Sequence, residues 1–295
     1  MTGRLFIFGL GFSGLEIARL ARAAGWTVAG TCRTAEKAAE LKRRGFEAHV
    51  FDGNAALAAE AVGRASHILC TIAPGTTGDP VLRTSARLLR GARWLGYLST
   101  TGVYGDHEGR WVDEDTPPQP AQPRSIERLA TERAWQAMGM EQGSAVDIFR
   151  LPGIYGPGRN AIDQVKAGTA RRIDKPGQVF SRIHVADIAG TVLLALGQRA
   201  GRIYNVADDL PAATGEVVAF ACELLGKPVP PPLPWDEVSP TMSAMARSFY
   251  AENRRVKNDR IKKELGVALR YPTYKDGLRA IHALPDRRPL AGSSS

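Results

Sequence analysis

The beginning of the chain combines a strand pattern, a glycine-rich turn and a helix pattern. Residues 4–8 form a short apolar run typical of a buried strand, and apolar positions with helical spacing begin at Leu15. Between them, Gly9, Gly11 and Gly14 stand at the spacing G-x-G-x-x-G. Gly9 permits a tight turn, Gly11 lets a pyrophosphate approach the backbone, and Gly14 lets helix and strand pack closely. The motif predicts a dinucleotide-binding site, with an ordinary β–α turn as the alternative.

The two residues that open the expected helix, Phe12 and Ser13, belong to the same predicted site. Backbone N–H groups in the first turn of a helix have no partner within the helix, and the helix dipole is positive there. An anion is therefore expected to sit on these N–H groups.

The end of the second expected strand, residues 26–31, bears on the choice of cofactor. In a dinucleotide-binding fold this end meets the adenosine ribose, where a carboxylate would bind the 2′-hydroxyl of NAD and repel the 2′-phosphate of NADP. Here Arg33 and Thr34 follow the strand, and Lys37 comes a turn later. A cation and a hydroxyl suit a dianionic phosphate, so the sequence predicts NADP in preference to NAD. The alternative is that Arg33 is a solvated surface residue.

Two more strand ends are candidates for cofactor contacts. Asp52 follows the third expected strand, residues 46–51, where it either holds the adenine amino group or caps a simple turn. The fourth expected strand, residues 67–72, is broken by an Ala-Pro-Gly sequence. Loops at the carboxyl ends of parallel strands face the ligand crevice. The candidate contacts from this strand and its loop are Thr71, Ala73 and Pro74.

Strand and helix patterns alternate along most of the chain. Further strands are expected at residues 94–99, 145–150 and 202–206, and helices at residues 35–44, 55–64 and 80–90. Such alternation with short breaks predicts an α/β fold, a doubly wound parallel sheet with right-handed crossovers.

The net charge and the apolar content limit the classes of partner that the chain is expected to bind. The chain has 39 Lys and Arg against 30 Asp and Glu, a net charge of +9, which favours anionic ligands but would suit nucleic acid equally. The glycine motif favours a small molecule, so no nucleic-acid partner is expected. No apolar run approaches the ~18 residues of a membrane span and no signal peptide is evident, which predicts a cytoplasmic protein without membrane attachment. The cysteines, Cys32, Cys70 and Cys222, are expected to be reduced and buried rather than metal ligands.

The middle of the chain carries further motifs in a specific order. They are S-T-T-G-V-Y-G-D from Ser99, D-E-D-T-P-P from Asp113, F-R-L-P-G-I-Y-G-P-G from Phe149 and I-H-V-A-D-I-A from Ile183. Together they resemble the extended short-chain dehydrogenase/reductases, the family of the NAD-dependent sugar-nucleotide epimerases and dehydratases, over most of the chain. The resemblance implies a Rossmann fold, hydride transfer and frequent dimerisation.

The resemblance also assigns catalytic roles, and this chain departs from the family at two of them. Thr100 matches the Ser or Thr that hydrogen-bonds the reacting oxygen, and Thr101 stands beside it. The family's Tyr-x-x-x-Lys pair, aligned through Glu132, falls on Arg124 and Arg128. An arginine stays protonated near neutral pH and cannot replace the tyrosine as an acid, whereas Arg128 could still hold ribose hydroxyls. Both could instead be surface arginines at helical spacing. The chain is thus similar to an atypical branch without the Tyr–Lys pair.

Three explanations remain for the missing proton donor. Tyr104 could swing in from its loop, a water relayed through Thr100 and Thr101 could serve, or the chain could carry out no redox chemistry. Tyr104 could also be a core aromatic residue with a satisfied hydroxyl. By the resemblance, Pro152 lies where the chain passes the nicotinamide.

The rest of the chain is expected to form a smaller lobe. The segment 171–183 has the pattern of a hairpin with a Pro-Gly turn. The Pro-rich run 227–235 is typical of a stiff connector. The basic run 254–266 is typical of a solvated helix face. His184 and Asp187 precede a helix and are expected to cap it and pack there rather than to bind a ligand.

These observations predict two lobes. The first is an NAD(P)-binding Rossmann domain formed by residues 1–156 and completed by residues 184–206. The second is a small substrate lobe formed by residues 157–183 and 207–288. A disordered tail is expected at residues 289–295. The expected function is an NAD(P)-dependent oxidoreductase of the epimerase/dehydratase type, acting on a carbonyl or carbinol of a small molecule that could be anionic or a nucleotide sugar. The alternative is a non-catalytic NAD(P)-binding sensor or scaffold. A homodimer is plausible.

Overall fold

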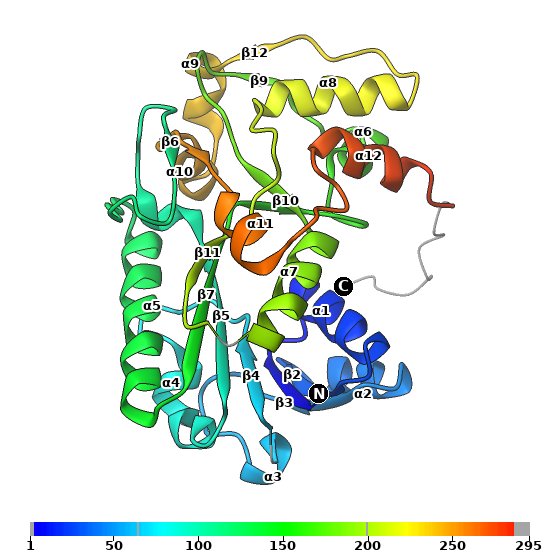
Figure 1. The fold of residues 1–295 in the computed structure, drawn as a ribbon. Coiled ribbons are helices and arrows are strands. Elements are labelled where there is room, and N and C mark those ends of the chain that lie inside the picture. The colour runs from blue at the N-terminus through cyan, green and yellow to red at the C-terminus, as the bar shows by residue number, and fades with distance from the viewer. Residues whose placement is uncertain (1–2, 64, 199, 286–295) are drawn as a thin grey trace.

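Seven parallel strands form the central sheet of the computed structural model, which describes residues 3–63, 65–198 and 200–285 (Figure 1). Their order across the sheet is β11-β7-β5-β4-β1-β2-β3. The strands are β1 (Arg4–Phe8), β2 (Thr27–Cys32), β3 (Glu47–Val50), β4 (His67–Cys70), β5 (Trp94–Thr100), β7 (Ala145–Leu151) and β11 (Ile203–Asn205). The predicted doubly wound parallel sheet is confirmed. The strand order reverses between β1 and β4, where such sheets bind ligands at the carboxyl ends of their strands.

Alternate side chains of β1 enter two separate cores, because successive residues of a strand point to opposite faces. Leu5 and Ile7 pack in a core with helices α1, α2, α7 and α11, whereas Phe6 and Phe8 pack in another with α3, α4, η1 and α5. Figure 1 shows α1 and α7 on one side of the sheet and α4 and α5 on the other. The helices are α1 (Phe12–Ala23), α2 (Ala35–Arg43), α3 (Ala59–Val62), α4 (Pro80–Ser85), η1 (Ala86–Leu89), α5 (Pro123–Gln142), α7 (Val185–Gln198) and α11 (Asp259–Leu265).

A third core lies outside the sheet and holds a second lobe together. This third core consists of buried residues from helices α6, α8 and α12 together with Tyr155 and Ala212. The elements of this region are β8 (Gly153–Tyr155), α6 (Ala161–Lys166), β9 (Ile173–Asp174), β10 (Arg182–His184), α8 (Thr214–Leu224), β12 (Leu233–Pro234), α9 (Trp235–Val238), η3 (Ser239–Thr241), α10 (Ala244–Tyr250) and α12 (Tyr274–His282). The exact limits of the two lobes stay a prediction, and the expected tail, residues 289–295, lies outside the described residues.

The hairpin predicted for residues 171–183 is wrong. A turn is present at the Pro-Gly sequence, with Gly177 at a φ of 74°. The strands on its two sides, however, pair with other partners: β9 runs parallel to β12, and β10 runs parallel to β8. The predicted turn is therefore present, but the pairing partners of the two strands are set by contacts with distant segments of the chain.

The basic run 254–266 is only partly the expected helix. Its first part forms β13 (Arg255–Val256), which pairs in parallel with β6 (Trp111–Val112), and the helix α11 begins at Asp259. Ile261 and Leu265 of α11 pack into the core on the sheet, although they lie within the predicted substrate lobe. Lys262 and Lys263 are exposed, so the solvated face is limited to one side of α11.

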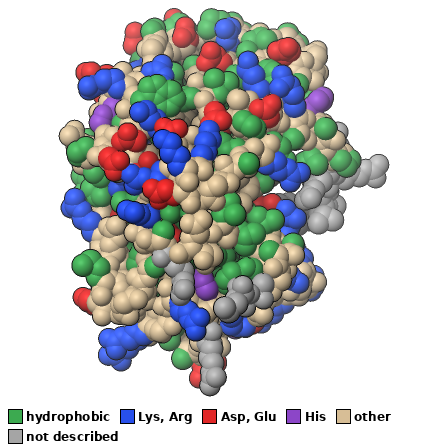
Figure 2. Space-filling model, viewed as in Figure 1, with side chains coloured by type: hydrophobic (Ala, Val, Ile, Leu, Met, Phe, Trp, Pro, Cys, Tyr) green, Lys and Arg blue, Asp and Glu red, His purple; other side chains and the backbone are tan. Residues whose placement is uncertain are grey.

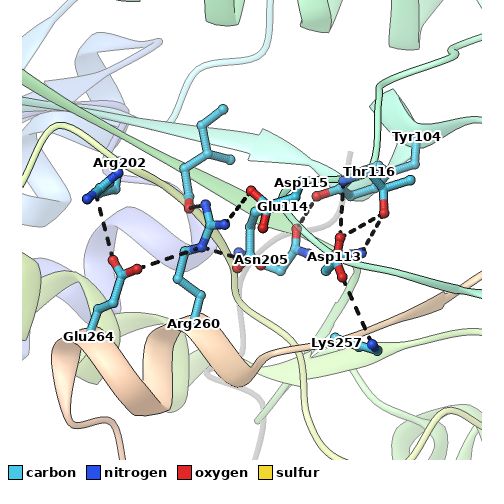
Figure 3. Close-up of polar contacts among 11 residues, drawn as sticks. Tyr104, Asp113, Glu114, Asp115, Thr116, Arg202, Asn205, Lys257, Arg260 and Glu264 are labelled. Atoms are coloured by element: carbon cyan, nitrogen blue, oxygen red, sulfur yellow. Dashed lines mark hydrogen bonds and ion pairs between the residues drawn. The ribbon is translucent and has the colours of Figure 1, made fainter.

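A polar network fastens the segment D-E-D-T-P to the sheet and to α11 (Figure 3). The buried Glu114 accepts a hydrogen bond of 2.8 Å from the backbone N–H of Asn205 in β11. Arg260 of α11 lies 3.8 Å from the Glu114 carboxylate and donates to Asp115 at 2.7 Å. Burial raises the pKa of Glu114. These contacts make the segment a structural fastening rather than part of a ligand site.

Candidate active-site cleft

The three glycines of the opening motif meet three different steric conditions. Gly9 has a φ of 99°, and a Cβ there would lie 2.5 Å from the Thr71 hydroxyl oxygen. A Cβ on Gly14 would lie 2.0 Å from the carbonyl oxygen of Gly9, so only glycine lets α1 pack this closely on the turn. A Cβ on Gly11 would meet nothing within 4 Å. The space at Gly11 is where the backbone is open to a ligand.

The start of α1 provides a place for an anion beside Gly11. Gly11 is the N-cap residue, no side chain caps the helix, and its first turn contains no acidic residue. Phe12 is exposed and Ser13 is half-buried. Unpaired N–H groups and the positive helix end therefore face open space, which fits the pyrophosphate of a dinucleotide.

The residues that follow β2 lie on the surface, and their proposed role at a 2′-phosphate stays a prediction. Arg33 and Thr34 are both exposed. The Thr34 oxygen accepts a hydrogen bond of 3.3 Å from the backbone N–H of Lys37 and so caps α2, while Lys37 pairs with Glu40 at 2.7 Å. Within the described part of the chain, Arg33 makes no ion pair. Arg33 is thus the cation most available for a phosphate, and Lys37 is already engaged.

The side chain of Asp52 forms a turn. Its two carboxylate oxygens accept hydrogen bonds of 2.9 Å from the backbone and side-chain nitrogens of Asn54. These bonds lower the pKa of the exposed Asp52. The turn, one of the two interpretations of Asp52, is therefore present, and a contact with the adenine amino group stays a prediction. Thr71 donates to the Gly9 carbonyl at 2.7 Å and steadies the turn, and Ala73 and Pro74 follow in the adjacent loop.

A cleft of about 640 Å³ separates the carboxyl end of β5 from the second lobe. It brings together five of the predicted site residues, namely Thr100, Thr101, Arg124, Arg128 and Pro152. The opposite wall comes from residues far away in the sequence, on β10, α8 and α10 and after α10. The two lobes therefore share one cavity.

The two arginines that the resemblance aligns with the family's Tyr–Lys pair, Arg124 and Arg128, differ in their surroundings. The Arg124 guanidinium lies over the ring of Phe249, 4.1 Å from the ring centre. Arg128 donates to the carbonyl oxygen of Leu98 at 2.8 Å, which holds it against β5. The Thr100 oxygen accepts from the N–H of Gly102 at 3.1 Å, so its hydroxyl proton can be donated to a ligand.

The interpretation of Tyr104 as a proton donor is wrong. Tyr104 is fully buried, and its hydroxyl donates to the side-chain oxygen of Asn205 at 2.8 Å. Burial raises the pKa of this hydroxyl. The side chain is absent from the lining of the cleft. Tyr104 is therefore a core residue with a satisfied hydroxyl, which was the other interpretation of it.

A buried ion pair supports the floor of the cleft. Glu132 of α5 and Arg150 of β7 are joined at 2.8 Å, and both side chains are almost fully buried. Ser99, next to Thr100, donates to the Glu132 carboxylate at 2.5 Å. The pair thus ties α5, which carries Arg124, to the two strands below it.

Sequence reasoning missed the functional candidates of the second lobe. Arg159, Arg182, Phe249, Glu252 and Arg254 all line the cleft. They occur in loops and short elements without periodic patterns, so no sequence signal indicated that they would meet. The expected capping is found only at His184, which precedes α7 and accepts from the N–H of Ala186. Asp187 lies within the first turn of α7 and accepts instead from the backbone N–H groups of Arg270 and Tyr271.

A parallel sheet with a glycine turn after β1 and a cleft at its carboxyl edge defines a Rossmann-type nucleotide-binding protein. The particular family follows from a comparison with family models. The model described as the NAD dependent epimerase/dehydratase family matches residues 6–207. The chain belongs to this family.

Individual proteins give a finer comparison. A functionally unknown conserved protein from Silicibacter pomeroyi has a solved structure with a TM-score of 0.86 and 43% identity, covering 96% of this chain and 99% of its own. Protein YeeZ of Escherichia coli is 28% identical over 76% of this chain and 84% of its own length. A Streptomyces protein named 3-diazoavenalumate denitrifying reductase is 26% identical over 69% of each chain.

The described residues contain no candidate membrane span or metal site. No helix there is long and apolar enough to cross a membrane. No group of three or more His, Cys, Asp or Glu side chains among them could hold a metal ion. Cys32, Cys70 and Cys222 are buried and free, as the sequence predicted.

Proposed function

We propose that this protein is an NAD(P)-dependent oxidoreductase that acts on a small anionic molecule. The observation that carries the proposal is the cleft itself, which places five arginines opposite and beside Thr100, at the carboxyl edge of a dinucleotide-type sheet. They are Arg124, Arg128, Arg159, Arg182 and Arg254. Guanidinium groups bind carboxylates and phosphates through paired hydrogen bonds, so the cleft favours substrates that carry such a group.

The residues present fit a bound dinucleotide. Gly11 and the first turn of α1 would hold its pyrophosphate, and Arg33 would meet a 2′-phosphate, which favours NADP over NAD. A bound nicotinamide supplies the hydride. Thr100 would donate its hydroxyl proton to the reacting oxygen of the substrate, and Arg128 would hold ribose hydroxyls. With Tyr104 buried in the core, proton exchange is assigned to water relayed through Thr100 and Thr101.

The comparisons support redox chemistry at this site. The family is described as NAD-dependent, and the name of the Streptomyces relative is that of a reductase. If this chain shares that chemistry, its substrate is reduced by hydride from the nicotinamide. Whether a nucleotide sugar is among its substrates is left to the test below.

The proposed ligand is a small molecule rather than a nucleic acid. On the face shown in Figure 2, Lys and Arg side chains are interspersed with Asp and Glu, which does not favour nucleic acid. A cytoplasmic location and a homodimer belong to the same proposal.

A second candidate function is a non-catalytic NAD(P)-binding sensor or scaffold. The observation that favours it is Arg124, which occupies the position of the family's acid and cannot exchange a proton near neutral pH. The sensor and the enzyme share the glycine turn and the cleft, so binding of the dinucleotide alone does not distinguish them.

The test is oxidation of NADPH by the purified protein with a panel of aldehydes and ketones that carry a carboxylate, a phosphate or a nucleoside diphosphate. An enzyme consumes NADPH with at least one acidic carbonyl compound, and Thr100→Val lowers kcat at least tenfold. Neutral analogues of the same compounds serve as controls. Consumption with none of them, although NADPH binds, would favour the sensor.

A further inference from the structure

One side chain of the cleft has an unmatched hydrogen-bonding atom. Glu252 lines the cleft, and its side chain is only 8% exposed. Its Oε2 atom accepts a hydrogen bond of 2.8 Å from Nη1 of Arg254. Its Oε1 atom is buried and has no partner among the described residues. Native proteins rarely leave a buried acceptor without a donor, because such an atom has lost its water and gained nothing in return.

Both lobes hold Glu252 in place. Its backbone carbonyl accepts a hydrogen bond of 2.9 Å from the side chain of Gln178, in the loop between β9 and β10. Nη1 of Arg254, which donates to the carboxylate, also donates to the carbonyl oxygen of Gly105 at 2.7 Å. Gly105 ends the short helix η2 (Thr101–Tyr104), which follows Thr100. The carboxylate is therefore tied through Arg254 to the residue after η2, and it lines the same cleft as Thr100, where the substrate is expected to bind.

The charges around Glu252 indicate the kind of ligand that it would meet. Glu252 is the one carboxylate among the described residues that line the cleft, and Arg254 is paired with it. Four more arginines line the cleft and attract an anion, namely Arg124, Arg128, Arg159 and Arg182. A carboxylate acting only as a charge would weaken the binding of an anion. As a hydrogen-bond acceptor, it would favour an anion that also carries a donor.

We propose that Glu252 is a specificity-determining residue: its Oε1 atom accepts a hydrogen bond from a hydroxyl or ammonium group of the substrate while the arginines bind the acidic group. The substrate class is therefore an acid that also carries a hydroxyl or an amine. This inference rests on the proposed function for the identity of the cleft as the substrate site.

Calorimetric binding of three matched probes to the full-length protein tests the inference. Glucose 6-phosphate, glucosamine 6-phosphate and cyclohexylmethyl phosphate share a phosphate and a six-membered ring, but the last has no donor on its ring. The wild-type protein is expected to bind at least one of the first two fivefold or more tightly than the third. Glu252→Leu is expected to reduce this preference to within twofold. Glu252→Gln, which keeps an acceptor, is expected to retain part of a hydroxyl preference but lose an ammonium preference.

Glu223→Gln on the exposed side of α8 is the matched control and is expected to leave every affinity unchanged. Thermal unfolding of each variant shows whether it is folded, and Glu252→Gln serves if Glu252→Leu does not fold. Equal binding of all three probes to the wild-type protein, no binding of any of them at 10 mM, or an undiminished preference in the folded Glu252 variants would overturn the inference. A titration with NADPH and the NADPH-oxidation assay on the same samples keep this outcome separate, because the proposed function fails if the dinucleotide does not bind or if no acidic carbonyl compound is reduced.

Discussion

The guanidinium of Arg124 lies over the ring of Phe249, with 4.1 Å between its central carbon and the ring centre. Arg124 is the second residue of α5 and lines the cleft, whereas Phe249 belongs to α10 of the second lobe and is 54% exposed. A cation–π contact between half-exposed groups contributes only about 0.5–1 kcal/mol. It therefore spans the cleft without locking it, and an anionic ligand can compete for the same guanidinium.

The first prediction concerns this contact. Arg124→Ala is expected to lower the free energy of unfolding by no more than about 1 kcal/mol, but to weaken the binding of cyclohexylmethyl phosphate at least tenfold. Phe249→Ala, which removes the ring and keeps the cation, is expected to leave that affinity unchanged or to raise it. Calorimetric titrations of both variants make the comparison. Equal losses in the two variants would mean that Arg124 acts through packing and not as an anion receptor.

Two glycines of the opening motif form a matched pair of tests. Gly14→Ala places a Cβ 2.0 Å from the Gly9 carbonyl oxygen, and we expect it to lower the free energy of unfolding by at least about 2 kcal/mol. Gly11→Ala fills open space, so the melting temperature should barely change while NADPH affinity falls at least tenfold. Denaturant unfolding and nucleotide titration measure the two effects. An unaltered affinity in Gly11→Ala would place the ligand elsewhere.

Removing one member of the buried pair below the cleft is expected to be costly. Glu132→Ala leaves the Arg150 guanidinium buried without its partner, for which we expect a loss of about 3–5 kcal/mol in the free energy of unfolding. Arg19→Ala breaks an exposed pair with Glu16 and is expected to change it by less than about 1 kcal/mol. Urea unfolding of the two variants tests the contrast. Similar losses would contradict the structural role assigned to Glu132.

The buried Asp208 predicts a dependence of stability on pH. Burial raises its pKa to about 8, whereas an unfolded Asp titrates near 3.9. Between these values the folded state binds the extra proton, so the contribution of Asp208 is fully present below about pH 4 and is lost as the pH rises through 8. Asp208→Asn should therefore gain in melting temperature over the wild type between pH 5 and pH 9. The exposed Asp236→Asn is the control, and parallel profiles for wild type and Asp208→Asn would contradict the assignment.

The parts of the site that belong to local motifs could be predicted from the sequence. The glycine turn depends on the steric needs of three positions, and the resemblance to the family indicated Thr100, Arg124 and Arg128. The second wall of the cleft could not be predicted. Arg182 and Glu252 meet Thr100 only because β10 pairs with β8 and because Arg254 reaches Gly105. Such long-range contacts leave no periodic signal in the sequence.

The predictions for Tyr104 and for the hairpin were wrong for a related reason. The V-Y-G segment places Tyr104 near the expected active site. In the structure, however, the Tyr104 hydroxyl lies in the core, where it donates a hydrogen bond to the side-chain oxygen of Asn205, about a hundred positions later in the sequence. The Pro-Gly turn is present, but the strands on either side of it, β9 and β10, pair with β12 and β8 instead of with each other. In both cases a distant residue decided between two locally possible arrangements.

Binding of the dinucleotide is the central claim, and a titration of the purified protein with NADPH and NADH tests it most directly, with Arg33→Ala measured alongside. Nicotinamide fluorescence and tryptophan quenching report the binding. We expect NADPH to bind at least tenfold more tightly than NADH, and this preference to disappear in Arg33→Ala. If neither nucleotide binds at concentrations near 1 mM, both the oxidoreductase and the sensor are contradicted, and the glycine turn has only an architectural role.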